Sequence, residues 1–111
     1  MEIKDNTTSC IFAPSCPKLT ATESRILFDE IKKEKRTVGI DLKYVYDCTI
    51  EFITELKRVG VLKNIGIFNI PSDIFALFNI MGIDKTVKLY VSESDFQEDS
   101  RQLLNRKFSI V

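Results

Sequence analysis

Short β-rich segments alternate with longer segments of helical periodicity along most of this chain, and this alternation restricts the fold more than any other feature. Strands are expected at Thr37 to Leu42, Asn64 to Ile70 and Thr86 to Val91. Helices are expected near residues 21–34, 48–59, 72–81 and 93–104. Strands joined through helices form mostly parallel sheets with right-handed crossovers. The expected fold is therefore α/β, a single domain over residues 1–111 with a four- or five-stranded mixed sheet and about four helices.

The two ends of the chain are expected to supplement this sheet. Met1 to Lys4 and Ser9 to Pro14 have the composition of short strands, the second closed by its proline. The tail from Lys107 to Val111 alternates between polar and apolar residues, so it is either an edge strand or loose.

Helix boundaries carry recognisable local signals. Thr20 precedes Glu23 by three residues, the spacing of a capping box. Asp47 is the expected N-cap of the second helix and Gly60 its left-handed exit, while Gly82 lies just past the third helix. The expected inward faces are Ile26, Leu27 and Ile31 in the first helix, Ile50, Ile53, Leu56 and Val59 in the second, and Ile74, Leu77, Phe78 and Met81 in the third; Phe96 and Leu103 anchor the last.

The composition is that of a soluble globular protein, with 44% apolar and 29% charged residues. We find no signal peptide in the first residues and no apolar run of the ~18 residues that a membrane span needs. Three cysteines without a CxxC spacing fit reduced thiols better than a disulfide framework. We therefore expect a cytoplasmic protein without membrane insertion.

Several classes of function are disfavoured by what the sequence lacks. It has no histidine, which removes Ser-His-Asp and Cys-His catalysis and His-containing zinc sites. Its four glycines are scattered and form no phosphate-binding loop. The only basic cluster, Lys32 to Arg36, suits a solvated helix end, and net charge is zero. We expect no enzyme activity, no metal, no cofactor and no nucleic-acid partner.

The segment Asp47-Cys48-Thr49 is the strongest candidate site, because it follows a buried strand and begins a helix. Ligands and partners of α/β sheets gather at the carboxyl ends of strands, and helix-start amides favour negative charge. The plainer interpretation is purely structural: Asp47 caps the helix, Cys48 packs and Thr49 begins the helix.

Three stretches of the chain resemble STAS domains, the fold of bacterial anti-sigma-factor antagonists. "TVGIDLKYV" resembles the family's aspartate-containing strand, and "DCTI" resembles its "DSSG" helix start. "IPSDIFALFNIMGIDKTVKLYVSESDF" resembles the long stretch that follows. The chain departs from the family pattern where Ile50 replaces the glycine and where the link after Asp41 is shorter. Without a gap in that link, Glu51 instead of Thr49 falls on the phosphoacceptor position.

The resemblance implies a non-catalytic interaction module that works by partner switching in transcription regulation. Its partner would be a kinase-type anti-sigma factor, and phosphorylation of Thr49 would switch binding off. It implies partner contacts at Asp47, Cys48, Thr49 and Glu51. An added phosphate carries roughly −1.5 to −2 charges, which an acidic patch on the partner would repel.

Phe75 is a further contact candidate, because it points about 120° away from the inward face of its helix at 100° per residue. Two alternatives remain open. In the same fold, the chain is a non-phosphorylated scaffold, or a small subunit of a transporter or a stressosome-like assembly. In another class, it is a small α/β enzyme or ligand-binding domain that uses Asp47 at a strand end.

Overall fold

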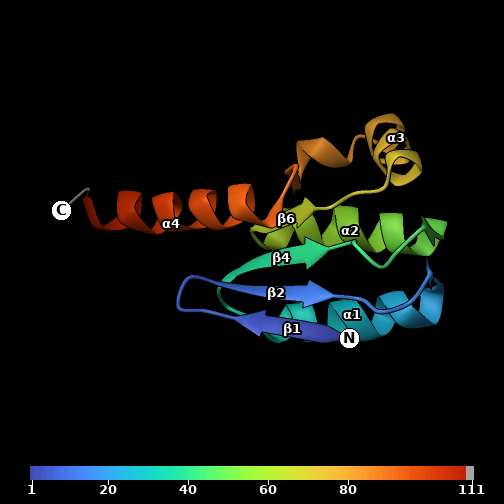
Figure 1. Cartoon of the computed structure of the whole chain (residues 1–111), viewed down its shortest axis with the longest axis horizontal. Helices are drawn as coiled ribbons and strands as arrows, with labels where there is room; N and C mark the ends of the chain where they lie inside the picture. The colour runs from blue at the N-terminus through green and yellow to red at the C-terminus, as the bar shows by residue number, and fades with distance from the viewer. Residues whose placement is uncertain (110–111) are drawn as a thin grey trace.

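The computed structural model describes residues 1–109, with side chains described through Arg101. Within these residues it is an α/β domain with a five-stranded mixed sheet and four α-helices, which confirms the expected fold class (Figure 1). The strands are β1 (Glu2–Asp5), β2 (Ser9–Ala13), β3 (Lys18–Leu19), β4 (Thr37–Asp41), β5 (Asp47–Cys48), β6 (Ile65–Phe68) and β7 (Lys88–Leu89). The helices are α1 (Ala21–Lys33), α2 (Ile50–Leu62), α3 (Ser72–Met81) and α4 (Glu93–Ser109), with a 3-10 turn η1 (Ile83–Lys85).

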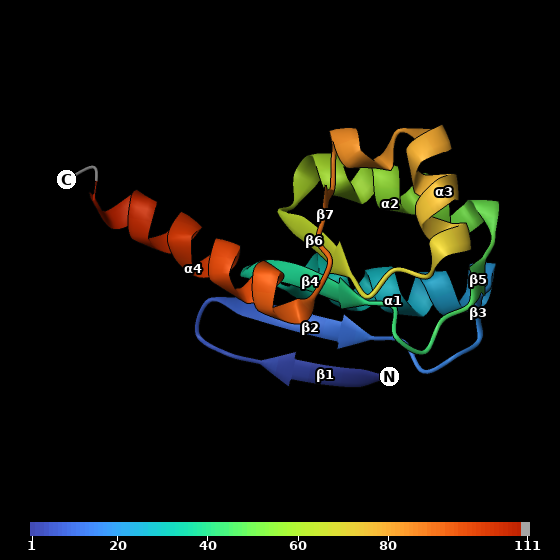
Figure 2. The same ribbon diagram turned by 45° about the horizontal axis from the view of Figure 1, so that its top comes forward.

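The main sheet has the strand order β1-β2-β4-β6-β7. β1 is antiparallel to β2, and the other neighbours are parallel. From β2 onward each crossover moves the chain to the next position in the same direction. Right-handed crossovers that all move one way place their helices on one face of the sheet, and α1, α2 and α3 lie on that face (Figures 1 and 2). The short strands β3 and β5 form a separate parallel pair.

The main core lies between this face and the three helices. Alternate residues of the central strands enter it, including Phe12, Val38, Ile40, Ile65 and Ile67. From the helices come the buried side chains Leu27, Phe28, Ile31, Phe52, Ile53, Leu56, Val59, Ile74 and Phe78. Leu77 and Met81 pack against this core while half-buried, as their place on the inward face of α3 predicts.

The opposite face of the sheet is covered by the first turns of α4, which then extends beyond the sheet (Figure 2). Phe96 is the anchor, as expected: it is buried, and its ring lies 5.4 Å from that of Phe68. The ring rests where the strands carry Gly39 and Gly66, and a Cβ built on either glycine would approach it to 2.8 Å. Two glycines in neighbouring strands therefore form the notch that lets α4 dock.

The end signals of α1 and α3 act largely as expected. The Thr20 hydroxyl accepts a hydrogen bond from the Glu23 amide at 3.3 Å, which is half of the expected capping box. The other half is absent, because the Thr20 amide donates to the carbonyl of Lys18. Gly82 follows α3 with φ of +70°, the left-handed conformation that glycine adopts without strain.

The expected exit of α2 at Gly60 is wrong. The helix runs from Ile50 to Leu62, so Gly60 lies inside it and is buried. A Cβ there would lie 2.7 Å from Cγ2 of Val87, which shows that Gly60 permits the close approach of the segment before β7. The local sequence cannot distinguish a glycine that ends a helix from a glycine that a distant segment requires for its close approach.

Two expected inward residues, Ile26 and Ile50, are 52% and 57% exposed. Phe28 and Phe52 are buried instead. For α2 the reason is geometric, since the proposed stripe used steps of three residues. At 100° per residue such a stripe drifts by 60° each step, so it cannot stay on one face over nine residues.

The C-terminal part also differs from expectation. The expected strand at 86–91 shortens to Lys88–Leu89, preceded by η1. The last helix extends to Ser109, so an edge strand beginning at Lys107 is wrong; residues 110 and 111 lie outside the described part. The expected anchoring by Leu103 concerns a side chain that also lies outside it. No helix in the described part is long and apolar enough to cross a membrane.

Candidate functional site

The start of α2 is held by strand pairing and not by a helix cap at Asp47. The amides of Tyr46 and Asp47 both donate to the carbonyl of Pro17, at 2.8 and 3.1 Å. The Thr49 amide donates to the Leu19 carbonyl at 3.0 Å. These bonds keep residues 46–49 extended beside β3, so the helix begins two residues later than expected, with Thr49 as its N-cap.

Asp47 is consequently a solvent-facing strand residue. Its Oδ1 accepts a hydrogen bond from the Cys48 amide at 2.8 Å. Its Oδ2 lies 3.8 Å from Nζ of Lys18 on β3, in an ion pair whose two side chains are 65% and 55% exposed. Such a pair contributes little to stability. The expected role of Asp47 as N-cap is wrong, while its exposure leaves it available to a partner.

Thr49 lies directly at the helix start and is half-buried. Its hydroxyl donates to the Leu19 carbonyl at 3.2 Å, and its side chain accepts no hydrogen bond from the first amides of α2. Glu51 lies two residues further along the chain, and a hydrogen bond from its own amide lowers the pKa of its carboxyl. Glu51 therefore stays anionic beside Thr49.

Cys48 is buried beneath this surface. Burial, with a smaller contribution from the charge of Asp47, raises the pKa of its thiol to about 11. A thiol with so high a pKa is almost entirely protonated at neutral pH and is a poor nucleophile. Among the candidates Asp47, Cys48, Thr49 and Glu51, Cys48 is therefore the one that packs into the core and cannot contact a partner directly.

The surface around the α2 start carries large exposed side chains that the sequence analysis did not assign to a contact surface. Tyr46 is 72% exposed and Ile50 is 57% exposed. In the chain they enclose residues 47–49, and the carboxylates of Asp47 and Glu51 lie next to them. For Ile50 the signal was available in retrospect, because a stripe with steps of three residues drifts off the inward face of a helix.

Phe75 is 45% exposed, as its position on α3 predicts. α3 lies next to β5, so the two helix starts share one end of the molecule (Figure 2). The Phe75 ring, however, lines a hollow of about 620 Å³ toward β7, together with Ile70, Leu89, Tyr90 and Val91. The structure therefore brings Asp47, Cys48, Thr49 and Glu51 together and places Phe75 beside a separate apolar hollow.

Asp41 is a polar feature that the sequence analysis passed over. It ends β4, is 2% exposed, and its Oδ1 accepts hydrogen bonds from Nδ2 of Asn69 and the amide of Lys43, both at 3.0 Å. Nζ of Lys43 lies 3.7 Å from Oδ2 of Asp41 and 3.6 Å from Glu2. An aspartate at the end of a central strand could have been read from the sequence as a candidate site residue. In this structure its hydrogen-bond partners are residues of the domain itself, so the role of Asp41 is structural.

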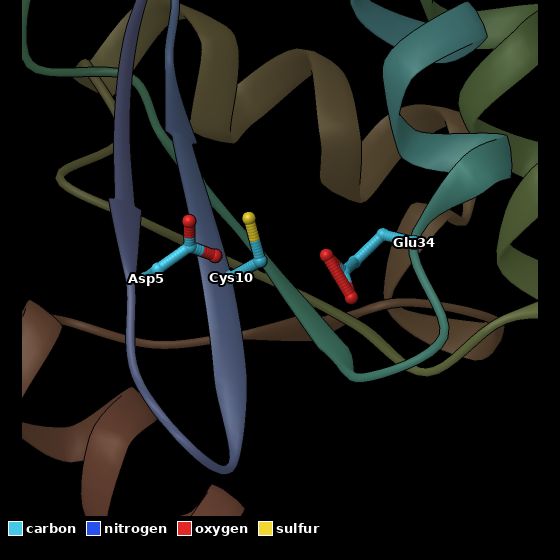
Figure 3. A group of neighbouring side chains, drawn as sticks. All are labelled: Asp5, Cys10 and Glu34. Carbon is cyan, nitrogen blue, oxygen red and sulfur yellow. The ribbon is translucent and has the colours of Figure 1, made fainter.

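One group of potential metal ligands exists among the described residues: Asp5, Cys10 and Glu34, whose ligand atoms lie within 4.8 Å of one another (Figure 3). Nη2 of Arg36 lies 2.6 Å from both Asp5 and Glu34. Hydrogen bonds from Arg36 lower the pKa of Glu34 to about 2, and burial raises that of Cys10 to about 12. A guanidinium already neutralises the carboxylates and the thiol stays protonated, so the group does not fit a metal site.

Comparison with known proteins adds no identification. No protein-family model matches the chain. No curated protein matches it either.

Proposed function

We propose that this protein is a STAS-like, non-catalytic interaction module that binds a protein partner through the surface around the start of α2. The observation that carries the proposal is the position of Thr49: it is the N-cap of α2, between the exposed side chains of Tyr46 and Ile50. Exposed aromatic and aliphatic side chains with a charged rim are what partner surfaces usually present. The resemblance described above points to the same surface.

Phosphorylation of Thr49 is the proposed switch. The Thr49 hydroxyl would give up its hydrogen bond to the Leu19 carbonyl, a loss of about 1 kcal/mol. The phosphate would be stabilised by amides of the first turn of α2, none of which the Thr49 side chain caps, and by the helix dipole. Asp47 and Glu51 already make this surface acidic, so the bulk of the phosphate is expected to matter to the partner as much as its charge.

The non-phosphorylated scaffold remains the second candidate, and one observation favours it. Thr49 is half-buried and its hydroxyl already has a structural partner in the Leu19 carbonyl. A threonine with this role requires no kinase. Under this alternative the same surface binds a partner constitutively, as in a small subunit of a larger assembly.

We do not propose an enzyme or small-ligand site at Asp47. Ligand crevices in open α/β sheets form where successive crossovers change direction. In this sheet the crossovers from β2 to β7 all move one way, and α4 covers the opposite face. Asp47 itself is exposed and paired with Lys18. The proposal therefore rests on a surface and not on a cavity.

The test has two parts. First, the protein is purified from its natural cells and its phosphorylation sites are mapped by mass spectrometry; the switch predicts phosphate on Thr49. Second, a photo-crosslinking residue replaces Tyr46, and a matched control carries it at Ile80, which is 81% exposed on another face of α3. The proposal predicts one protein crosslinked from position 46 and not from position 80.

The crosslinked partner is then titrated calorimetrically against Thr49→Glu and Thr49→Val. The switch predicts a weaker complex with Thr49→Glu and an almost unchanged one with Thr49→Val. Equal affinity for all forms would remove the switch and leave the scaffold. Absence of any partner at position 46 would refute the interaction surface itself.

A further inference from the structure

The opposite end of the molecule combines exposed aliphatic side chains with lysines from two helices. α1 and α2 run in the same direction, so they end at the same edge of the sheet (Figure 1). We call this region the basic end and define it by Lys33, Lys35, Lys57, Val61, Leu62 and Lys63. Val61 and Leu62 are 71% and 76% exposed, although both belong to the last turn of α2. Lys57 lies one turn before Val61 on the outer face of that helix.

The lysines of the basic end are mostly not neutralised within the fold. Lys35 and Lys57 make no ion pair with any described residue. Nζ of Lys63 donates to a backbone carbonyl, that of Glu34, at 2.5 Å. Lys33 alone has a carboxylate, Glu30, at 3.5 Å.

The nearby carboxylates are engaged elsewhere. Glu34 is held by Arg36, whose Nη2 lies 2.6 Å from its Oε1. Glu55 pairs with Lys32 at 3.1 Å and also with Arg58. The basic end therefore keeps an excess of positive charge in a chain of zero net charge.

A polar hollow of about 430 Å³ adjoins Leu62. Its lining also contains one carboxylate, that of Glu34, which Arg36 holds. Apart from Leu62, the other lining residues are basic, hydroxyl-bearing or amide-bearing: Lys35, Arg36, Lys63, Thr7, Thr8, Thr37, Ser100 and Asn64. Ammonium groups and hydroxyls are the donors that phosphate oxygens accept from. The hollow thus places phosphate-binding chemistry directly beside an exposed leucine.

We propose that the basic end is a docking surface for an anionic phospholipid bilayer. Val61 and Leu62 reach the boundary between headgroups and acyl chains, and Lys35, Lys57 and Lys63 contact the phosphates. A projecting pair of aliphatic side chains among lysines suits such an interface. Nucleic acid is a poorer fit, because none of these six residues is aromatic and single-stranded nucleic acid is bound largely by stacking of its bases on aromatic side chains.

This inference does not depend on the proposed function. α2 has 13 residues and is about 20 Å long, so its start lies well away from its end. A domain resting on a bilayer through Val61 and Leu62 would hold Thr49 toward the solvent. Both surfaces could then be occupied at the same time.

The experiment is flotation of the full chain with phosphatidylcholine vesicles and with vesicles containing phosphatidylglycerol in addition. We expect binding to the anionic vesicles only, decreasing steeply between ~0.1 M and ~1 M salt as the screening length shortens. Lys57→Gln should weaken vesicle binding about fivefold, the contribution of one lysine near an anionic surface. Leu62→Ser should weaken it by about tenfold through the loss of buried aliphatic area.

Matched controls come from the α3–η1 region. Ile80→Ser removes an aliphatic side chain that is 81% exposed, and Lys85→Gln removes an exposed lysine. Neither should change vesicle binding. Circular dichroism of all variants verifies that each remains folded.

Two competitor probes separate the sources of the anion. Saturable binding of glycerol phosphate, with vesicle binding insensitive to Leu62→Ser, would show a soluble phosphate ligand and overturn the bilayer proposal. A polyglutamate peptide that binds as tightly as the vesicles and is also insensitive to Leu62→Ser would indicate an acidic protein partner instead. Absence of binding to anionic vesicles at ~0.1 M salt would overturn the proposal directly.

Discussion

Replacing Gly39 by alanine is expected to destabilise the domain by overpacking, and the effect should disappear when Phe96 is made smaller. The added Cβ would lie 2.8 Å from two atoms of the Phe96 ring and 3.0 Å from Cγ1 of Ile11. Gly39 lies in the central strand β4, whose backbone cannot move without disturbing its neighbours on both sides. Overpacking of this kind costs about 1–3 kcal/mol.

The partner variant is Phe96→Leu. Phe96 is 1% exposed and its ring packs against Phe68 and Tyr90. Truncation to alanine would cost roughly 3–5 kcal/mol, so the smaller change to leucine should cost about 1–2 kcal/mol. In the double variant the leucine leaves room for the new methyl group. Its total cost should therefore be close to that of Phe96→Leu alone, which makes the coupling equal to the cost of Gly39→Ala, about 1–3 kcal/mol.

The assay is urea unfolding followed by circular dichroism, with an unchanged m-value required of every variant. For a domain of this size m is about 1–3 kcal/mol per molar, so a loss of ~2 kcal/mol moves the midpoint by ~1 M. Gly82→Ala is the control. Its φ of +70° makes alanine strained by about 1–2 kcal/mol, but the nearest atoms, on the Lys85 side chain, are 3.7 Å or more from the new Cβ. Its cost should simply add to that of Phe96→Leu.

Additive costs for Gly39→Ala and Phe96→Leu, within ~0.5 kcal/mol, would refute the notch as the reason for Gly39. They would also mean that α4 does not rest on the sheet as described. The result bears on the fold of the second face, because α4 is the helix that packs on it through Phe96.

Three further predictions concern the site and the charges. Phe75→Ala should cost under about 1 kcal/mol of stability because the ring is 45% exposed, whereas Phe78→Ala in the core should cost roughly 3–5 kcal/mol in the same urea assay; equal losses would place Phe75 in the core. The pKa of Glu34 is lowered from 4.5 to about 2, so its pair with Arg36 stabilises the fold above pH 4.5 and is lost as the pH falls toward 2. Glu34→Gln should therefore flatten the loss of stability over that interval, and an unchanged pH profile of the urea midpoint would contradict the pairing. Cys48, with a pKa of about 11, should react with iodoacetamide at pH 7.5 at least about 100-fold more slowly in the native protein than in urea, and comparable rates measured by mass spectrometry would show it accessible as thiolate.

The elements that the sequence predicts well are those whose signals are local. Each central strand is a short β-rich run, and the helices carry caps and exits that depend on adjacent residues, such as Thr20 and Gly82. Phe75 was correctly expected to be exposed because helical periodicity alone determines which face it occupies. These inferences require no knowledge of what lies across the sheet.

Predictions failed where a distant segment decides. Asp47 has every local mark of an N-cap, yet carbonyls of Pro17 and Leu19, about thirty residues earlier, hold the segment extended as a strand. Gly60 resembles a helix exit, yet it serves the approach of Val87. The basic end is a similar case: Lys35 and Lys63 come together only because α1 and α2 run side by side.

Asp41 shows how a local residue can depend on a non-local one. Its carboxylate is buried at the end of β4, where an unpaired charge would be strongly unfavourable. Asn69 meets that need with an amide donor at 3.0 Å, and it does so from a backbone φ of +54°. Asparagine is among the few non-glycine residues that adopt this conformation readily, and glycine would bring no donor. Position 69 therefore requires two properties at once, and the reason for both lies in a strand 28 residues away.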